Sequence, residues 1–342
     1  MNVMKKTKTV WPGVLFESGS REKSLPVTFA MLFFLFFALI PSLTVQAQEN
    51  VRITYANNSL AFLISFIAKD RAFYAKNGLN AELVQVRPGV AIAALLSGDA
   101  DYAEVLGSAI RSAAKGAPVR AVSTSVRAPF FSLVVHPDIK SVRDLKGRVI
   151  GVTSLGGTNQ ISTRLLLQHF GIDPDREVKM LAIGEEKFMY EALKVRRVDA
   201  IMVAPPFSVL LKREGFPLLA HTAQLVSIPF VGLSATMEKI RQNRSQVKRV
   251  LKAEVEALRY LRDNPAGSAE VIRKRFAMDE AMARESYSMV VDAFSKDGRV
   301  DAAGIENLLN LEKKGGTIAN SVTVDQVVDL SVGEEVLKEL GR

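Results

Sequence analysis

Stretches typical of strands alternate with stretches typical of helices from residue 51 to residue 235. Residues 51–55 and 79–86 alternate apolar and polar side chains, which is the pattern of a strand with one buried face. Residues 59–76 and 90–97 have the composition of helices, and Gly78 and Gly98 stand where these helices are expected to end. This alternation indicates an α/β fold with largely parallel sheets.

The same order of elements recurs further along the chain. Strands are predicted at residues 102–106, 119–125, 148–152, 178–182 and 200–203, and helices at 108–115, 158–170 and 185–194. Beyond residue 235 the pattern changes to long amphipathic helices, at 237–264 and 266–275. The repeated order favours two similar α/β halves followed by a helical C-terminal region.

An apolar segment near the N-terminus, residues 29–40, has the length of an export-signal core and is short for a membrane span. Five Lys and Arg residues precede it, and Val45 and Ala47 suit a signal peptidase that cuts after Ala47. The uncharged stretch 25–45 leaves an uncleaved membrane anchor as the alternative, since a span needs about 20 residues. We predict a signal peptide at residues 1–47 and export to the periplasm by the general route.

Composition excludes several kinds of site. The chain has no cysteine, which rules out disulfides, thiolate metal sites and cysteine nucleophiles. Its formal charge of +9 includes +3 from residues 1–47, and the remaining +6 is spread without the basic stripe that nucleic-acid binding needs. The three histidines, His136, His169 and His221, lack metal-ligand spacing. We therefore predict no nucleic-acid partner, metal or cofactor.

Three strand-to-helix loops carry the candidate binding residues. They contain Asn58 and Ser59, Gly107 and Ser108, and the longer set Ser154, Gly156, Gly157, Thr158 and Asn159. A helix N-terminus has unpaired N–H groups and a positive dipole end, which attract carboxylate, sulfonate or phosphate groups. The third loop is the strongest candidate, and it is not a Walker loop because no Lys follows its glycines at the required spacing. Plain helix caps and a tight turn are the alternative interpretation.

Four further residues stand at positions where a ligand could lie. Pro205 and Pro206 end a strand and could form a rigid apolar wall. Arg127 could pair with an anion through two parallel hydrogen bonds, although a lone loop Arg is more often solvated. Glu104 lies on an otherwise apolar strand, where burial is costly unless the carboxyl group is paired. If Glu104 faced a cleft, it would favour a ligand with a hydrogen-bond donor.

A series of motifs occurs in a characteristic order: FYAKNGL at 73–79, ALLSGDAD at 94–101, GAP at 116–118, DLKGRVIGV at 144–152 and APP at 204–206. In this order the chain resembles the substrate-binding proteins of ABC importers, in the family that handles alkanesulfonates, taurine, nitrate and pyrimidine precursors of thiamine. The resemblance covers about residues 51–235. Arg196 and Arg197 depart from it, because relatives usually carry glycine in that turn.

The resemblance implies a type II periplasmic-binding-protein fold, in which two lobes joined by crossing strands hold the ligand between them. Lobe 1 would begin with residues 51–130, lobe 2 would span 137–228, and 229–342 would return to lobe 1 and form the C-terminal helices. The crossing strands are expected at 130–135 and 229–235. A hinge would close on the solute, and a membrane permease and a cytoplasmic ATPase would be the partners of a monomeric receptor.

The positive charge and the helix N-termini favour a small organic anion, a sulfonate or carboxylate, as the solute. The alternative is a pyrimidine, which Glu104 and Phe130 or Phe207 could hold. An enzyme is the third possibility, because the fungal pyrimidine-synthase branch is similar in fold. That branch relies on a cysteine-rich stretch and an iron-binding histidine, and this chain has no cysteine. We predict a receptor without catalytic activity.

Overall fold

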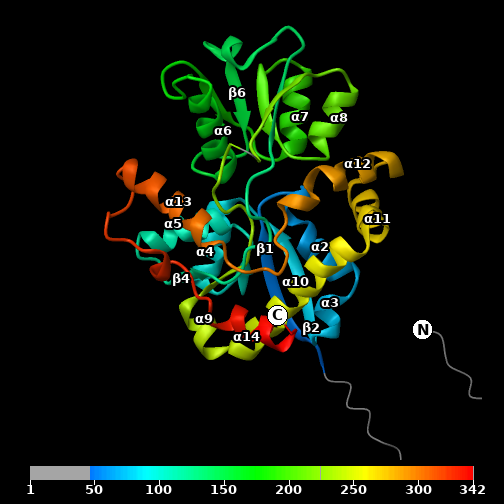
Figure 1. Cartoon of the computed structure of the whole chain (residues 1–342), viewed down its shortest axis with the longest axis vertical. Helices are drawn as coiled ribbons and strands as arrows, with labels where there is room; N and C mark the ends of the chain where they lie inside the picture. The colour runs from blue at the N-terminus through cyan, green and yellow to red at the C-terminus, as the bar shows by residue number, and fades with distance from the viewer. Residues whose placement is uncertain (1–46, 224, 342) are drawn as a thin grey trace, which may run out of the picture. The chain divides into compact units, whose positions relative to one another are not determined.

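The computed structural model describes residues 47–341 except Gln224, and two five-stranded sheets organise them (Figure 1). The predicted signal segment, residues 1–47, lies outside the described residues apart from Ala47. The first sheet has the order β2 (Leu79–Gln85), β1 (Glu49–Tyr55), β3 (Tyr102–Ala103), β10 (Ser234–Thr236) and β4 (Val119–Ala121). β1 is parallel to both of its neighbours, whereas β10 is antiparallel to β3 and β4.

The second sheet contains the strands between residues 132 and 221. Its order is β7 (Lys179–Ala182), β6 (Val149–Val152), β8 (Ala200–Val203), β5 (Ser132–Val135) and β9 (Leu218–His221). β6 is parallel to β7 and β8, and β5 is antiparallel to β8 and β9. Both sheets therefore have a parallel centre with one strand reversed, and the α/β prediction is confirmed.

Burial explains why these segments are strands. In β1 the side chains of Val51, Ile53 and Tyr55 are buried while Arg52 is exposed, which matches the alternation in the sequence. Every residue of β8 is buried, as expected for a central strand of a sheet covered on both faces. The centre of each sheet is thus fixed by apolar burial, which contributes about 25 cal/mol for each Å² removed from water.

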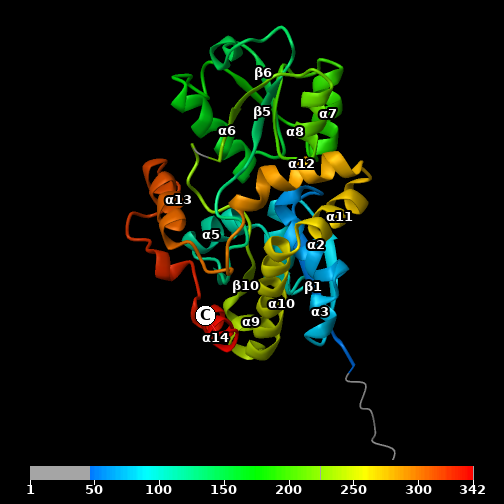
Figure 2. The same cartoon turned by 45° about the vertical axis from the view of Figure 1, so that its right-hand side comes forward.

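Helices cover both sheets. Those of the second sheet are α6 (Thr158–His169), α7 (Glu186–Lys194) and α8 (Phe207–Arg213). Those around the first sheet are α2 (Leu63–Asp70), α3 (Phe73–Lys76), α4 (Pro88–Ser97), α5 (Leu106–Ala114), α9 (Met237–Gln242), α10 (Arg244–Asp263), α11 (Pro265–Phe276), α12 (Glu280–Val290), α13 (Ala302–Lys314) and α14 (Ser331–Glu339). The C-terminal helices α9 to α14 thus return to the first sheet, where α10 packs against α2, α3 and α14 (Figures 1 and 2). Within the described residues, no helix combines the length and the apolar character of a membrane span.

Four predicted elements are shorter or more broken than expected. The predicted strand at 119–125 ends at Ala121. The predicted helix at 59–76 begins with a 3-10 turn at Leu60–Phe62 and is interrupted at Ala72, which adopts a left-handed φ of 58°. The predicted helix at 237–264 is divided at Asn243. The predicted strand at 102–106 ends at Ala103, because α5 already begins at Leu106. The short β3 leaves Glu104 and Val105 at the edge of the sheet rather than within it.

The turn at Arg196 also differs from its counterpart in the first half of the chain. Arg196 adopts a left-handed φ of 56°, and Gly98 adopts 82° after the corresponding helix. A side chain in this conformation costs roughly 1–2 kcal/mol, a cost that glycine does not have. The Arg196 guanidinium pairs with Asp138, so the unusual residue is tied to the loop after β5.

The chain passes between the two sheets twice, at residues 122–131 and 222–233. These two segments meet at an antiparallel bridge between Val126 and Val231. A Cβ atom on Gly232 would lie 2.1 Å from the carbonyl oxygen of Ser123, so only glycine fits at this approach. The crossing strands predicted at 130–135 and 229–235 thus lie partly inside the sheets, since 132–135 forms β5 and 234–235 belongs to β10.

Candidate functional site

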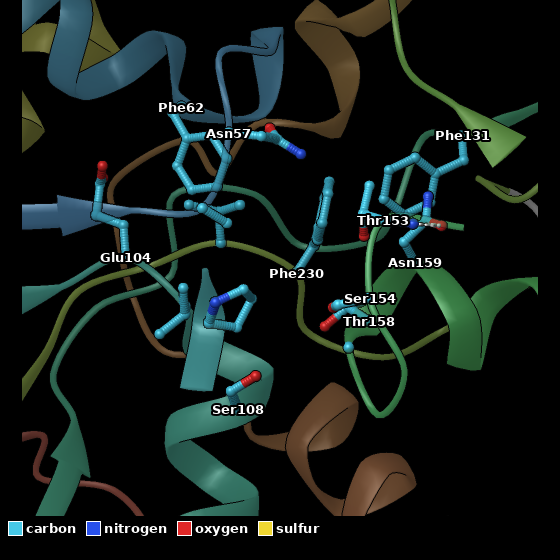
Figure 3. Close-up of a pocket in the computed structure, with 15 residues that line it drawn as sticks. Asn57, Phe62, Glu104, Ser108, Phe131, Thr153, Ser154, Thr158, Asn159 and Phe230 are labelled. Carbon is cyan, nitrogen blue, oxygen red and sulfur yellow. Dashed lines mark hydrogen bonds between the residues drawn. The ribbon is translucent and has the colours of Figure 1, made fainter. Parts of the chain in front are cut away.

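A small pocket lies between the two sheets, beside the crossing segments (Figure 3). We call it the inner pocket. Its volume is about 50 Å³. Its lining comes from both sides: Ala56, Asn57, Phe62, Pro88, Glu104, Val105 and Ser108 near the first sheet, Thr153, Ser154, Gly157, Thr158 and Asn159 near the second, and Phe131, Phe230 and Val231 from the region between them.

The lining follows from the ends of the parallel strands. Asn57 follows β1, Glu104 follows β3, and Thr153 follows β6, so the carboxyl ends of three strands converge on one space. Two helices begin at the same place, because Ser108 lies in the first turn of α5 and Thr158 is the first residue of α6. Unpaired N–H groups at the start of a helix make such a place suitable for acceptor oxygens and anions.

Hydrogen bonds hold the second-lobe loop, residues 153–159, to itself, to Gln160 and to β8. The backbone N–H of Thr153 donates to the Asn159 Oδ1 atom at 3.2 Å, and Asn159 Nδ2 donates to the carbonyl oxygen of Met202 at 2.8 Å. The N–H of Gly156 donates to Gln160 Oε1 at 2.6 Å. Asn159 therefore fixes the loop to β8 with the polar atoms of its side chain, which leaves Thr158 and Ser154 to face the pocket (Figure 3).

A buried carboxyl group forms part of the opposite wall. Glu104 is 1% exposed, and Ser65 Oγ donates to its Oε1 atom at 2.6 Å. Its Oε2 atom is buried and has no hydrogen-bond partner within the described residues, as is also true of Asn57 Oδ1. Burial raises the pKa of Glu104 to about 8, so the group is predominantly protonated at neutral pH.

A second buried carboxyl group lies behind Glu104. Glu254, on α10, accepts a hydrogen bond from Ser123 Oγ at 3.4 Å and is 2% exposed. Burial, and then the charge of Glu104, raise the pKa of Glu254 well above its ordinary value. Two carboxyl groups so close together in an apolar region cannot both ionise without a large cost in free energy.

The inner pocket adjoins a wider hollow, which we call the outer cleft and which shares four lining residues with it. Its volume, by the same measure, is about 560 Å³. The outer cleft is lined by Arg87, Pro88, Gly89, Val90, Ile92, Ser108, Arg111, Ser112, Lys115, Ser154, Leu155, Gly156 and Gly157. Across it, Arg111 Nη2 donates to the carbonyl oxygen of Gly156 at 2.9 Å. This bond joins α5 beside the first sheet to the loop before α6 beside the second.

The two walls also touch at Gly107. A Cβ atom on Gly107 would lie 2.8 Å from Thr158 Oγ1, which is closer than a carbon atom approaches an oxygen without a shift. Glycine at this position therefore permits the observed approach of the two walls.

The structure brings five of the predicted site residues to the inner pocket: Ser108, Ser154, Gly157, Thr158 and Asn159. Gly156 lines the outer cleft instead, and Gly107 lies at the contact with Thr158. The loops at 107–108 and 154–159 thus lie face to face.

Besides Gly107 and Gly156, six predicted residues do not line the inner pocket. Asn58 accepts a hydrogen bond from Arg275 Nε at 3.2 Å, and Ser59 is the buried residue before the 3-10 turn of Leu60–Phe62. The exposed Arg127 donates to the carbonyl oxygen of Asp292 at 3.1 Å. Phe130 packs at a ring distance of 5.7 Å against Phe230.

Pro205 and Pro206, the remaining two, are buried where β8 leads into α8. The residue before them, Ala204, donates its N–H group to Glu186 Oε2 at 3.3 Å. These prolines therefore form part of the connection between β8 and α8.

Sequence reasoning missed several lining residues, often by one position. Asn57 lines the pocket where Asn58 was predicted, and Phe131 where Phe130 was predicted. Both pairs lie in loops, Asn57 and Asn58 in a bend after β1 and Phe130 and Phe131 just before β5, where the direction of each side chain depends on the local backbone. Phe62 and Phe230 carry no local signal, because they approach the pocket only through the packing of the two sheets.

No histidine lines the inner pocket or the outer cleft. His221 shares a hydrogen bond with Ser132 at 3.0 Å, and His136 lies 2.8 Å from Asp138. Across the described residues, no group of three or more His, Asp and Glu side chains converges closely enough to hold a metal ion.

Two mixed sheets, two crossing segments and a pocket between the sheets are typical of the type II periplasmic-binding-protein fold. Among solved structures, the chain is similar to the periplasmic nitrate-binding protein NrtA of Synechocystis PCC 6803, at a TM-score of 0.71 with 18% identity, covering 86% of this chain and 89% of that one. It is also similar to the periplasmic aliphatic sulphonate-binding protein SsuA of Escherichia coli, at a TM-score of 0.65 with 19% identity, covering 82% and 97% of the two chains.

Sequence comparison gives the family. The NMT1/THI5-like model matches residues 59–268, more than half of the chain, so the protein belongs to the NMT1/THI5-like family. A candidate binding protein of Brucella abortus is 25% identical over 250 residues, which cover 71% of this chain and 76% of that protein. The nitrate/nitrite binding protein NrtA of a Nostoc species is 30% identical over 121 residues, which cover 35% and 27% of the two chains.

Proposed function

We propose that the protein is an exported, non-catalytic receptor of an ABC importer, which captures a small organic anion between its two lobes. The observation that carries this proposal is the inner pocket, because its walls come from both sheets and its polar groups lie at the ends of parallel strands. The relatives named above include binding proteins for sulfonate and nitrate. We divide the chain into lobes as the sequence predicts, at about 51–130, 137–228 and 229–342.

The preference for an anion rests on the helix N-termini and on the outer cleft. The N–H groups that open α5 and α6, with the hydroxyl group of Ser108, supply donors to a carboxylate or sulfonate where the inner pocket meets the outer cleft. The cationic side chains of the outer cleft attract the solute toward this position.

We propose that capture follows a hinge motion about the crossing segments at 122–131 and 222–233. In the open form the contact between Gly107 and Thr158 and the bond from Arg111 to Gly156 would be broken. Solute binding would favour the closed form by contacting both walls at once. A permease and an ATPase in the inner membrane would be the partners of the closed, monomeric receptor.

A pyrimidine or another solute with N–H donors is the second candidate. The buried acceptor atoms Glu104 Oε2 and Asn57 Oδ1 favour it, since neither has a hydrogen-bond partner within the described residues. The rings of Phe62, Phe131 and Phe230 could hold a flat body.

Export is tested by N-terminal sequencing of secreted material. The proposal predicts a mature chain that begins at Gln48. A membrane-bound product that keeps Met1 or Met4 would contradict cleavage and support an uncleaved anchor.

Binding is tested by a thermal-shift screen of the mature protein against sulfonates, carboxylates, nitrate and pyrimidines. A solute at 100 times its Kd should add about 2.7 kcal/mol to the free energy of unfolding. Thr158→Trp should abolish that gain, because the indole would fill the space between the walls. Thr158→Ala is the matched control, and it should keep the fold and most of the affinity. If both variants bind as tightly as the original protein, the inner pocket is not the binding site.

A further inference from the structure

We propose that the outer cleft is a subsite for an anionic group of the solute, formed by Arg87, Arg111 and Lys115. On this basis the solute is an elongated organic acid. Its apolar body enters the inner pocket, and its carboxylate or sulfonate group stays in the outer cleft. The inference rests on the proposed receptor function and specifies how the solute is oriented.

The two hollows differ in the ionisable residues that line them. The residues that line the outer cleft include the cations Arg87, Arg111 and Lys115 and no Asp or Glu. The residues that line the inner pocket include Glu104 and no Lys or Arg. An anion in the inner pocket would lie beside a buried carboxyl group and no lining cation, whereas an anion in the outer cleft would face three positive side chains.

Arg111 is the fixed member of the cation set. Its side chain is 11% exposed, and its Nη2 atom donates to Ser108 Oγ at 3.1 Å as well as to Gly156. The acidic group facing it is Glu312 of α13, 3.8 Å from Nε, and Nη1 has no hydrogen-bond partner within the described residues. Arg111 thus combines a fixed geometry with unused donor capacity, which is suited to a carboxylate or sulfonate oxygen.

Arg87 and Lys115 are exposed and complete the cation set from two different elements. Arg87 precedes α4, and Lys115 follows α5. Arg87 also lines a third hollow, of about 330 Å³, together with Glu185 and Phe188. Both side chains therefore lie on the exposed lining of the outer cleft, where the anionic group of a long solute would lie.

The sizes of the two hollows support the same orientation. The inner pocket offers about 50 Å³ and the outer cleft about 560 Å³ by the same measure. Phenylalanine rings surround the inner pocket, so the small enclosed end suits an apolar or aromatic group. A solute longer than the inner pocket would extend directly into the outer cleft, because Pro88, Ser108, Ser154 and Gly157 line both hollows.

The test uses pairs of probes that differ only in charge. Benzoate, 3-phenylpropionate and benzenesulfonate are each titrated by calorimetry beside the corresponding amide. The titrations use the mature protein, the double variant Arg87→Ala/Lys115→Ala, and the control Lys179→Ala on the exposed edge strand β7. At least one acid should bind at least about tenfold more tightly than its amide, and added salt should reduce the difference.

The double variant should reduce the preference for the acid to less than about threefold, and Lys179→Ala should leave it unchanged. The inference is overturned if no acid of the set binds, if the amides bind as tightly as the acids, or if the preference survives in the double variant. The receptor function is judged separately: binding of any solute that is lost in Thr158→Trp supports it, even when the anion subsite fails.

Discussion

The two walls of the inner pocket are built in different ways. On the second-lobe side, Asn159 accepts from the N–H of Thr153 and donates to the carbonyl oxygen of Met202, so both polar atoms of its side chain are paired and hold the loop to β8. On the first-lobe side, Glu104 and Glu254 are buried with oxygen atoms that lack hydrogen-bond partners within the described residues. One wall therefore stabilises the fold while the other costs free energy, and such a cost is typical of sites that contact a ligand.

The largest expected effect is on stability, depends on pH, and comes from the buried Glu104 in the first-lobe wall. The pKa of Glu104 rises from 4.5 to about 8 on folding, so the folded state binds more protons than the unfolded state between these values. The contribution of this group to stability should therefore be complete below about pH 4.5 and be lost as pH rises toward 8, by up to about 1.4 kcal/mol per pH unit. Glu186 contributes in the same direction, because burial raises its pKa to about 8 as well.

Glu104→Gln should remove one such contribution. Urea unfolding at several pH values should show a shallower fall in stability for this variant, and little difference from the original protein near pH 5. The same slope in both proteins would mean that Glu104 is not a protonated, buried group.

The next effect concerns the second-lobe wall, where Asn159 holds the loop at 153–159. Asn159→Ala leaves a backbone N–H and a carbonyl oxygen without their side-chain partners, which should cost about 1–3 kcal/mol of stability. Gln160→Ala is the matched control, because its bond to the Gly156 N–H is exposed and should be worth less than about 1 kcal/mol. Solute affinity should fall more in Asn159→Ala than in Gln160→Ala. Equal losses in the two variants would show that Asn159 does not hold the loop.

The contact between the walls gives a smaller effect that a double variant can isolate. Gly107→Ala should weaken solute binding by about tenfold, because the added Cβ meets Thr158 Oγ1 at 2.8 Å. It should not lower the stability of the unliganded protein, since Ala favours a helix more than Gly does. Adding Thr158→Ala should restore part of the affinity. Additive losses in the double variant would contradict a direct contact in the bound form.

The smallest effect concerns an ion-pair contact between α8 and α12, which lies away from the pocket. Arg213 lies 2.9 Å from Glu285 and 3.4 Å from Asp279, and all three side chains are at least one-third exposed. Arg213→Ala should therefore change stability by less than about 1 kcal/mol. Scattering of the unliganded protein should show a slightly larger radius of gyration. A substantial loss of stability would mean that this contact is more than a surface ion pair.

Much of the fold could be predicted because strand alternation and helix spacing are local properties. β1, β2 and β8 lie within a residue or two of the predicted ranges, and the turn at Gly98 is left-handed as a helix-ending glycine requires. The breaks at Ala72 and Asn243 were not predicted, since neither position carries Gly or Pro. Their conformations depend on how separate helices pack, which no short stretch of sequence specifies.

The candidate site likewise contains residues that the local sequence indicates and residues that only the packed chain brings together. The loop at 154–159 was visible because two glycines and a hydroxyl residue precede a helix. Phe62 and Phe230 were not visible, because they are distant in sequence and meet only in the packed chain. Glu104 could be predicted in part. An acidic residue on an apolar strand indicated a carboxyl group whose burial costs free energy, and Glu104 is buried in the structure.

The central claim, capture of a solute by closure of two lobes, can be tested by one distance measurement. The chain has no cysteine, so Leu96→Cys on α4 and Val195→Cys after α7 would carry the only two spin labels, both at exposed positions. We predict a broad distance distribution without solute, which becomes narrow and shifts to shorter distances when a solute from the thermal-shift screen is added. The added Thr158→Trp substitution should prevent that change. A distribution that stays the same when a saturating solute binds would contradict the account.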